Sequence, residues 1–365
     1  MADRVIVVKI GTSSVTDDRG RLTTAAIEKL AGEVAGQRAA GDRVVVVTSG
    51  AIAAGLPVLG LHPRPNDPAV LQAVSAVGQG YLFAAWEAAL RGRGLVAGQV
   101  LLAPLDFVHR RQYLHARRTL EHLLDLGVVP VINENDAIAD DEIRFGDNDR
   151  LAALVAHLLH AEALVLLTDT PGLLTGDPRR REDASLIEEI VEVDAEIEAL
   201  AGGTGTVRGS GGMASKLAAA KMAAWSGVRA VIAGADRPDV LASALAGTAG
   251  SGTVFVPRQQ RLGARKLWIA FAVGSSGTVV VDAGAEKALR ERGVSLLPAG
   301  VIGVHGDFEA DDAVEIAGPH GRTFAKGLVR HPASVVKEWA GRQTSTLPPE
   351  AVHEVVHRDD LVLLP

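Results

Sequence analysis

The chain has 365 residues, 47% hydrophobic and 22% charged, with a formal net charge of −7. This composition is typical of a soluble globular protein, and the length predicts two domains. The acidic balance argues against a protein dedicated to nucleic acid, and the absence of cysteine excludes disulfides and thiolate metal sites. Because the sequence has neither a signal-peptide pattern nor an apolar run near ~18 residues, we expect a cytoplasmic protein with no membrane span.

Apolar runs alternate with helical periodicity through the first two thirds of the chain. Strands are predicted at 5–10, 44–47, 95–102, 128–132, 164–167 and 228–233. Helices are predicted at 23–41, 70–90, 113–126, 151–159 and from 213 onward. Uninterrupted apolar strands suit a parallel sheet that is buried on both faces. The alternation therefore predicts an α/β fold, a layered α/β/α sandwich with a mostly parallel central sheet.

The character of the sequence changes near residue 257, where a polar and basic stretch begins. We expect a first domain at 1–257, a linker at 258–272 and a second domain at 273–365. Short strands are predicted at 267–273, 277–282, 313–317 and 324–329, with short helices at 286–292 and 335–339. The second domain is thus predicted to be a small mixed β-barrel.

Amides and carboxylates crowd the exit of the strand at 128–132 and the entry of the next helix. They include Asn133, Asp136, Asn148 and Asp149. Buried without partners, such groups are costly, and ligands of open α/β sheets bind beyond the carboxyl ends of the strands. The stretch therefore indicates a ligand site. Between these residues, 140–142 is acidic but lacks the EF-hand spacing, which favours a solvated loop tip.

Four turns rich in glycine or hydroxyl side chains follow predicted strands, at 11–13, 48–51, 168–169 and 210–212. Glycine lets backbone N–H groups approach an anion closely. Any one of these turns alone, however, is more simply explained as an ordinary connection between a strand and a helix. Lys9 and Lys216 stand beside two of the turns. Each alone is a snorkelling lysine, but together they offer two charges to a phosphate. Neither a Walker A pattern nor a GxGxxG after a strand is present.

Histidines suggest two further sites. His353–His357 matches the HExxH zinc pattern, which requires a helix and a third ligand. The flanking sequence predicts strand and turn, so we interpret the match as chance. The histidines and arginines between residues 109 and 122 favour a solvated or subunit-facing surface.

Five segments resemble the glutamate 5-kinase branch of the amino-acid kinase family. They are VVKIGTS (7–13), VVTSGAIAAG (46–55), PVINENDA (130–137), GDND (146–149) and GGMASK (211–216). SLLPAGV (295–301) and VHRDD (356–360) resemble the PUA domain of many bacterial members. The resemblance implies ATP-dependent phosphorylation of the γ-carboxylate of L-glutamate to L-glutamyl 5-phosphate, the first step of proline biosynthesis.

The resemblance also implies roles for individual residues. The expected catalytic residues are Lys9, Lys216 and Asp149, with Asp149 holding the two lysines in place. The expected substrate-binding residues are Ser49, Asn133, Asp136 and Asn148. The expected nucleotide-binding residues are Lys9, Thr168, Asp169, Ser210, Gly211, Gly212, Met213, Ala214, Ser215 and Lys216. Ser210 stands where the family pattern has threonine, and it keeps the hydroxyl.

A carboxylate is an adequate nucleophile at neutral pH, so catalysis needs positioning and charge neutralisation rather than a general base. ATP and Mg²⁺ are the implied cofactors, with Mg²⁺ carried by the phosphates and no protein metal ligand predicted. The resemblance further implies a homo-oligomer (dimer or tetramer) and feedback inhibition by L-proline. Two alternatives stay open: an RNA-binding or RNA-modifying protein acting through the PUA module, and a sister kinase for another carboxylate.

Overall fold

The computed structural model describes residues 4–17, 20–107, 109–138, 148–176, 181, 183–201, 212–259, 261–348 and 352–364. The chain divides into two compact units, Met1–Leu262 and Gly263–Pro365. Each unit has its own hydrophobic core. The domain boundaries expected at 257 and 273 stay predictions. None of the described helices is long and apolar enough to cross a membrane.

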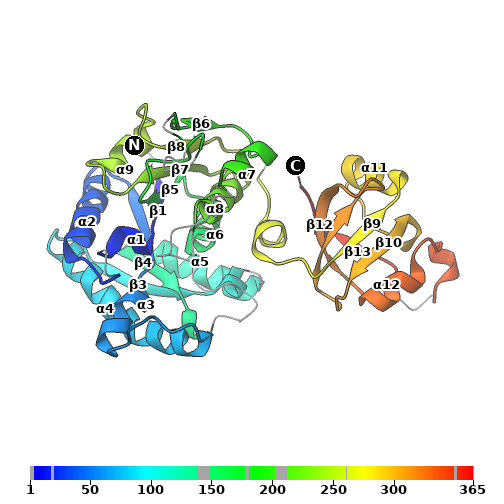
Figure 1. Ribbon diagram of the computed structural model, residues 1–365, viewed down its shortest axis with the longest axis horizontal. Coiled ribbons are helices and arrows are strands. Elements are labelled where there is room, and N and C mark those ends of the chain that lie inside the picture. Colours follow the sequence, from blue (N-terminus) through cyan, green and yellow to red (C-terminus); the bar gives the residue numbers. More distant parts are fainter. Residues whose placement is uncertain are drawn as a thin grey trace. The chain divides into compact units, whose positions relative to one another are not determined.

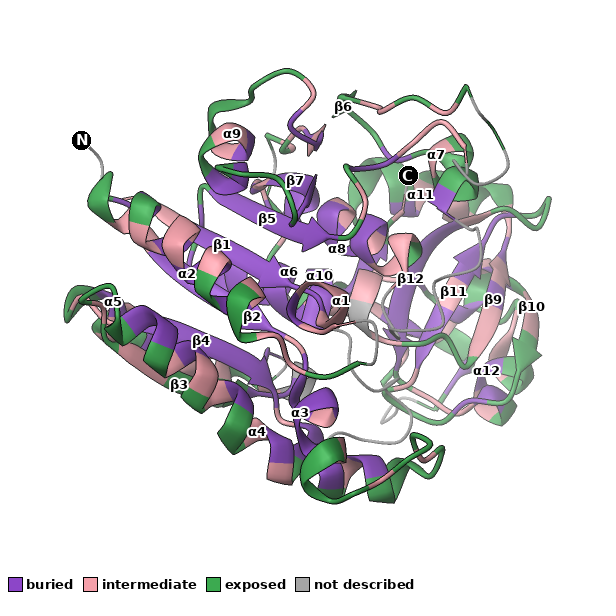
Figure 2. Cartoon of the chain, turned by 60° about the vertical axis from the view of Figure 1, so that its left-hand side comes forward, coloured by how far each residue is buried: buried purple, intermediate pink, exposed green. Residues whose placement is uncertain are grey.

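The first unit contains an eight-stranded sheet in the order β3-β4-β2-β1-β5-β7-β8-β6. Its strands are β1 (Val5–Ile10), β2 (Arg43–Thr48), β3 (Ala97–Leu102), β4 (Val129–Glu134), β5 (Ala163–Thr168), β6 (Glu189–Ile190), β7 (Arg229–Gly234) and β8 (Thr253–Phe255). All neighbours pair in parallel except β7 and β8. Figure 2 shows β1, β4 and β5 buried along most of their length. The predicted mostly parallel sheet is confirmed.

Helices form a layer on each face of this sheet. They are α1 (Thr12–Val15), α2 (Thr24–Ala39), α3 (Ala51–Val58), α4 (Pro68–Arg91), α5 (Arg110–Asp125), α6 (Asn148–Leu158), α7 (Ala195–Ala201), α8 (Met213–Trp225) and α9 (Val240–Ala246). In Figure 1, α2, α4 and α9 lie on one side of the sheet, and α5, α6 and α8 lie on the other. This is the expected three-layer sandwich.

Helices α3 and α4 cross at two glycines. A Cβ built on Gly78 would lie 1.8 Å from the carbonyl oxygen of Ala51, and one on Gly55 would lie 2.1 Å from that of Val74. The two backbones are therefore in direct contact, which only glycine permits at these positions. Because α3 begins right after the β2 turn, this contact fixes α4 relative to the carboxyl end of β2.

The second unit is built on a five-stranded mixed sheet in the order β10-β9-β11-β12-β13. Strands β9 and β11 pair in parallel, and the other pairs are antiparallel. The elements are β9 (Gly277–Val281), β10 (Val301–Gly306), β11 (Ala313–Ala317), β12 (Thr323–Val329), β13 (Val356–Leu363), α10 (Ala264–Leu267), α11 (Ala283–Arg292) and α12 (Ala333–Trp339). Val279, Ile316 and Phe324 are among its fully buried residues.

The strand predicted at 267–273 is wrong. Residue Leu267 ends α10, and Trp268–Ala272 form a π-helical turn. A short apolar run fits a buried helix as well as a strand, so its pattern alone does not decide between them. At the other end of this unit, His357 lies in β13 and His353 precedes it outside any helix. The HExxH match therefore lacks the helix that a zinc site of this kind requires.

Candidate active site

The predicted site residues meet at the carboxyl-end edge of the central strands. Lys9, near the end of β1, lies in register with Val47 of β2 and Leu166 of β5. The turn after β2 approaches that after β1, because the backbone N–H of Ser49 donates to the carbonyl of Ile10 at 3.0 Å. Gly50 follows with φ +116°, a conformation that favours glycine. Parallel strands thus gather these turns at one edge.

A buried cluster of charges forms around Asp149 in the first turn of α6. Its Oδ1 lies 2.6 Å from Nζ of Lys9, and its Oδ2 lies 3.3 Å from Nζ of Lys216 on α8. The hydroxyl of Ser215 donates to the same Oδ2 at 2.6 Å. We call these four residues the lysine cluster. The cluster joins β1, α6 and α8, which are far apart in the sequence.

The electrostatics of the lysine cluster favour an ionised Asp149. Burial by itself raises the pKa of this carboxyl group, but the charges of Lys9 and Lys216, with hydrogen bonds from Lys9 and Ser215, lower it to about 2. Two buried ammonium groups then share one carboxylate. Two lysine side chains at one place suit a phosphate, for which lysine is a point-charge partner.

A second group of polar side chains lies around Asn148, which begins α6. Its Nδ2 donates to Oγ of Ser49 at 3.1 Å, and its Oδ1 accepts from the backbone N–H of Glu134 at 3.1 Å. Asn148 therefore ties the β2 turn to the end of β4. Two predicted substrate residues, Ser49 and Asn148, are brought together in this way, and Asn133 precedes Glu134 in β4.

Asp136 and Asn133 each contact helix α4. The Ser75 hydroxyl donates to the Asp136 carboxylate, and Nδ2 of Asn133 donates to Oε1 of Gln79 at 2.6 Å. Burial raises the pKa of Asp136, and the Ser75 hydrogen bond opposes that rise. Sequence reasoning missed Ser75 and Gln79. Their only signal is two polar residues four apart in a mostly apolar helix.

The predicted nucleotide residues lie at β5 and α8. Thr168 ends β5, and its hydroxyl donates to the carboxylate of Asp169 at 3.1 Å. Gly212 is the N-cap of α8, and Met213, Ala214 and Ser215 form the first turn. An exposed helix N-terminus attracts phosphate through its backbone N–H groups and dipole. Ser210 and Gly211, like the acidic tip at 140–142, lie outside the described residues.

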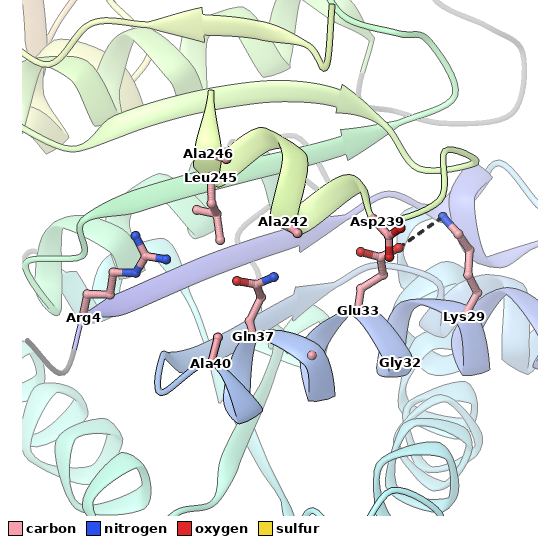
Figure 3. Close-up of a pocket in the computed structure, with 11 residues that line it drawn as sticks. Arg4, Lys29, Gly32, Glu33, Gln37, Ala40, Asp239, Ala242, Leu245 and Ala246 are labelled. Atoms are coloured by element: carbon pink, nitrogen blue, oxygen red, sulfur yellow. Dashed lines mark ion pairs between the residues drawn. The ribbon is translucent and has the colours of Figure 1, made fainter. Parts of the chain in front are cut away.

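Two observations bear on other ligands. Among the residues that the structure describes, no group of three or more histidine, aspartate or glutamate side chains is arranged to hold a metal ion. A separate cavity of about 530 Å³ lies between α2 and α9 (Figure 3). Its lining includes Arg4, Glu33 and Gln37, and it contains none of the predicted site residues.

Known proteins resemble the chain over nearly its full length. Residues 4–234 match the amino acid kinase family, and residues 277–347 match the PUA domain. A glutamate 5-kinase of Moorella thermoacetica is 44% identical over 365 residues, which cover 99% of this chain and 96% of that protein. One of Nocardia farcinica is 46% identical over 359 residues, covering 98% of this chain and 96% of that protein.

A solved structure agrees on the fold. Carbamate kinase from Giardia lamblia bound to AMP-PNP superposes with a TM-score of 0.50 at 17% identity, covering 70% of this chain and 99% of that one. At this identity the likeness concerns the fold alone. The family match spans more than half of the chain, and the curated relatives match almost all of it. The chain therefore belongs to the amino acid kinase family, as a member with a C-terminal PUA domain.

Proposed function

We propose that this protein transfers the γ-phosphoryl group of ATP to the γ-carboxylate of L-glutamate, the first step of proline biosynthesis. Relatives similar over nearly the whole chain bear the name glutamate 5-kinase. The observation that carries the proposal is the meeting of two unlike clusters at one sheet edge. The lysine cluster suits phosphates, and the amide and carboxylate cluster around Asn148 suits an amino acid.

In the proposed reaction, an oxygen of the substrate γ-carboxylate attacks the γ-phosphorus of ATP as the bond to the ADP oxygen breaks. No proton moves, so no general base is needed. Lys9 and Lys216 neutralise the charge that builds on the transferred group, and Asp149 holds both ammonium groups in position. Fixed charges of this kind are the main contribution to phosphoryl transfer.

The other end of the substrate would lie among Ser49, Asn133, Asp136 and Asn148. Asp136 is the partner proposed for the substrate ammonium, since it is the carboxylate of this group. Mg²⁺ bound with ATP would supply further neutralisation of the phosphate charge. Aligning the two anions is the remaining task, and it lowers the entropic part of the barrier.

The experiment that tests the activity is a hydroxamate assay. The protein is incubated with ATP, Mg²⁺, hydroxylamine and one acid at a time: L-glutamate, L-aspartate or N-acetyl-L-glutamate. We expect the acyl hydroxamate with glutamate and little with the other two. Product with another acid and none with glutamate would assign the protein to a sister kinase.

Three further expectations belong to this proposal. The protein would form a homo-oligomer, a dimer or tetramer, which light scattering would measure. L-proline would inhibit glutamate phosphorylation, which the same assay would detect. A cytoplasmic location would follow from the substrates, and cell fractionation tests it.

A further inference from the structure

Helix α4 presents two side chains, one turn apart, to the amino-acid end of the site. Residues four apart lie on one face of a helix, so Ser75 and Gln79 point the same way. Ser75 contacts Asp136, and Gln79 contacts Asn133. Ser75 and Gln79 thus contact two of the four residues that are expected to bind the substrate.

Gln79 determines which atom of Asn133 is free to meet a ligand. The Asn133 amide nitrogen donates to Oε1 of Gln79, so the carbonyl Oδ1 faces elsewhere. This Oδ1 is buried and receives no hydrogen bond from any described residue. An unpaired buried acceptor is costly, so its presence at a binding site indicates a ligand that donates a hydrogen bond.

Ser75 orients Asp136, as Gln79 orients Asn133. Its hydroxyl donates to Oδ2 of the carboxylate, which favours the ionised form and fixes the orientation of the group. Asp136 is 8% exposed, and Oδ1 is its remaining oxygen. Asp136 and Asn133 are three residues apart at the end of β4, and both contact one face of α4. A ligand group bound by both would need to donate more than one hydrogen bond and to balance a negative charge. An ammonium does both, whereas an N-acyl amide has one N–H and no charge.

We propose that Ser75 and Gln79 are positioning residues that configure Asp136 and Asn133 as a receptor for a free α-ammonium group. The receptor selects unacylated amino acids over acids of the same length that lack the charge. This inference rests on the proposed function, because it places the substrate ammonium at Asp136.

The first test compares substrates in one variant. Gln79→Met keeps the side-chain length but removes the amide. We expect the glutamate KM to rise about tenfold, the equivalent of ~1.4 kcal/mol, with the ATP KM within twofold of wild type. Gln79→Glu keeps an acceptor for the Asn133 amide and should restore most of the glutamate affinity. Gln112→Ala, an exposed glutamine on α5, is the matched control and should change neither KM.

The second test isolates the ammonium. Glutarate is glutamate without its amino group, and it is measured as a competitive inhibitor against glutamate. In Gln79→Met and Ser75→Ala, the glutarate Ki should stay within twofold while the glutamate KM rises, because glutarate has no group that uses the receptor. Equal changes for both acids, or an unchanged glutamate KM, would overturn the proposal.

Two controls separate the ways in which the tests can fail. Thermal unfolding shows whether each variant is folded, and Ser75→Thr, which keeps the hydroxyl, should retain more glutamate affinity than Ser75→Ala. Calorimetry of glutamate and glutarate binding gives the same selectivity ratio without turnover. If the wild type makes no glutamyl hydroxamate, the proposed function fails. If the binding ratio is the same in wild type and variants, the inference about Ser75 and Gln79 fails.

Discussion

The two halves of the candidate site differ in how their charges are balanced before a ligand arrives. In the lysine cluster, one carboxylate already contacts two ammonium groups and a hydroxyl. Around Asp136 and Asn133, α4 engages one atom of each side chain, and the buried Oδ1 of Asn133 accepts no hydrogen bond from any described residue. The pKa of Asp149 is lowered to about 2, whereas that of Asp136 is raised. In the proposed reaction, the phosphates would therefore meet charges that are already held in place, and the substrate ammonium would meet side chains that α4 orients.

Removing the charge of Asp149 should have the largest effect. In Asp149→Asn, two buried ammonium groups lose their shared partner, and breaking a buried ion pair typically costs about 3–5 kcal/mol. We expect a lower melting temperature, partly restored by MgATP, and a fall in kcat of about 10²–10³-fold. The hydroxamate assay and thermal unfolding measure these changes. A kcat within tenfold of wild type would show that the lysines hold their positions without Asp149.

Asp136→Ala should affect the other half of the site. Truncating one member of a desolvated charge pair costs about 2–5 kcal/mol, so the glutamate KM should rise by roughly 30-fold or more. The ATP KM should change little, because Asp136 is not part of the lysine cluster. Asp239→Ala, at an exposed aspartate before α9, is the control. Equal rises in both KM values would remove Asp136 from the role of ammonium partner.

The pH dependence should differ between the halves. Burial raises the pKa of Asp136, and only its ionised form can hold an ammonium. Thus kcat/KM for glutamate should fall as pH decreases toward this raised pKa, while Asp149, with a pKa of about 2, stays ionised and the ATP KM stays constant. Ser75→Ala removes the hydrogen bond that lowers the Asp136 pKa, so the fall should begin at a higher pH. If the glutamate kcat/KM and the ATP KM changed together with pH, the prediction that only the Asp136 half of the site titrates in this range would be wrong.

The smallest effect is expected for Ser215→Ala. This change removes one hydrogen bond to Asp149 but keeps both lysine contacts. A hydrogen bond to a charged group contributes about 1.5–3 kcal/mol, and because both lysine contacts remain we expect the lower end, so kcat should fall by roughly tenfold. The glutamate KM should stay near the wild-type value. A loss as large as that of Asp149→Asn would show that Ser215 does more than hold the carboxylate.

The sequence predicts the central sheet well, because strands such as β1 and β5 are continuous apolar runs with few alternatives. It does not predict α3, because its eight residues include Gly55 and Pro57, both of which disfavour a helix interior. Strands β6 and β8, of two and three residues, are too short for a periodic signal. The strand at 267–273 was predicted wrongly because a short apolar run fits a buried helix as well as a strand.

Some residues of the candidate site can also be predicted from the sequence, and others cannot. Lys9, Asp149 and Lys216 are visible in the sequence because charged residues in apolar surroundings stand out, and the resemblance adds roles that stay predictions. Ser75 and Gln79 are not visible in this way. They reach Asp136 and Asn133 across 61 and 54 residues of chain, a proximity that only the fold creates. Local patterns do not report contacts at that separation.

The backbone contact of Gly55 and Gly78 has a consequence for anyone who wishes to redesign this protein. Gly78 lies between Ser75 and Gln79 on α4, so a methyl group there would push against α3 and displace both side chains together. A library that seeks a new acid substrate can vary residues 75 and 79 freely, but it should leave both glycines untouched. Two residues without side chains thus limit which chemical preferences this scaffold can acquire.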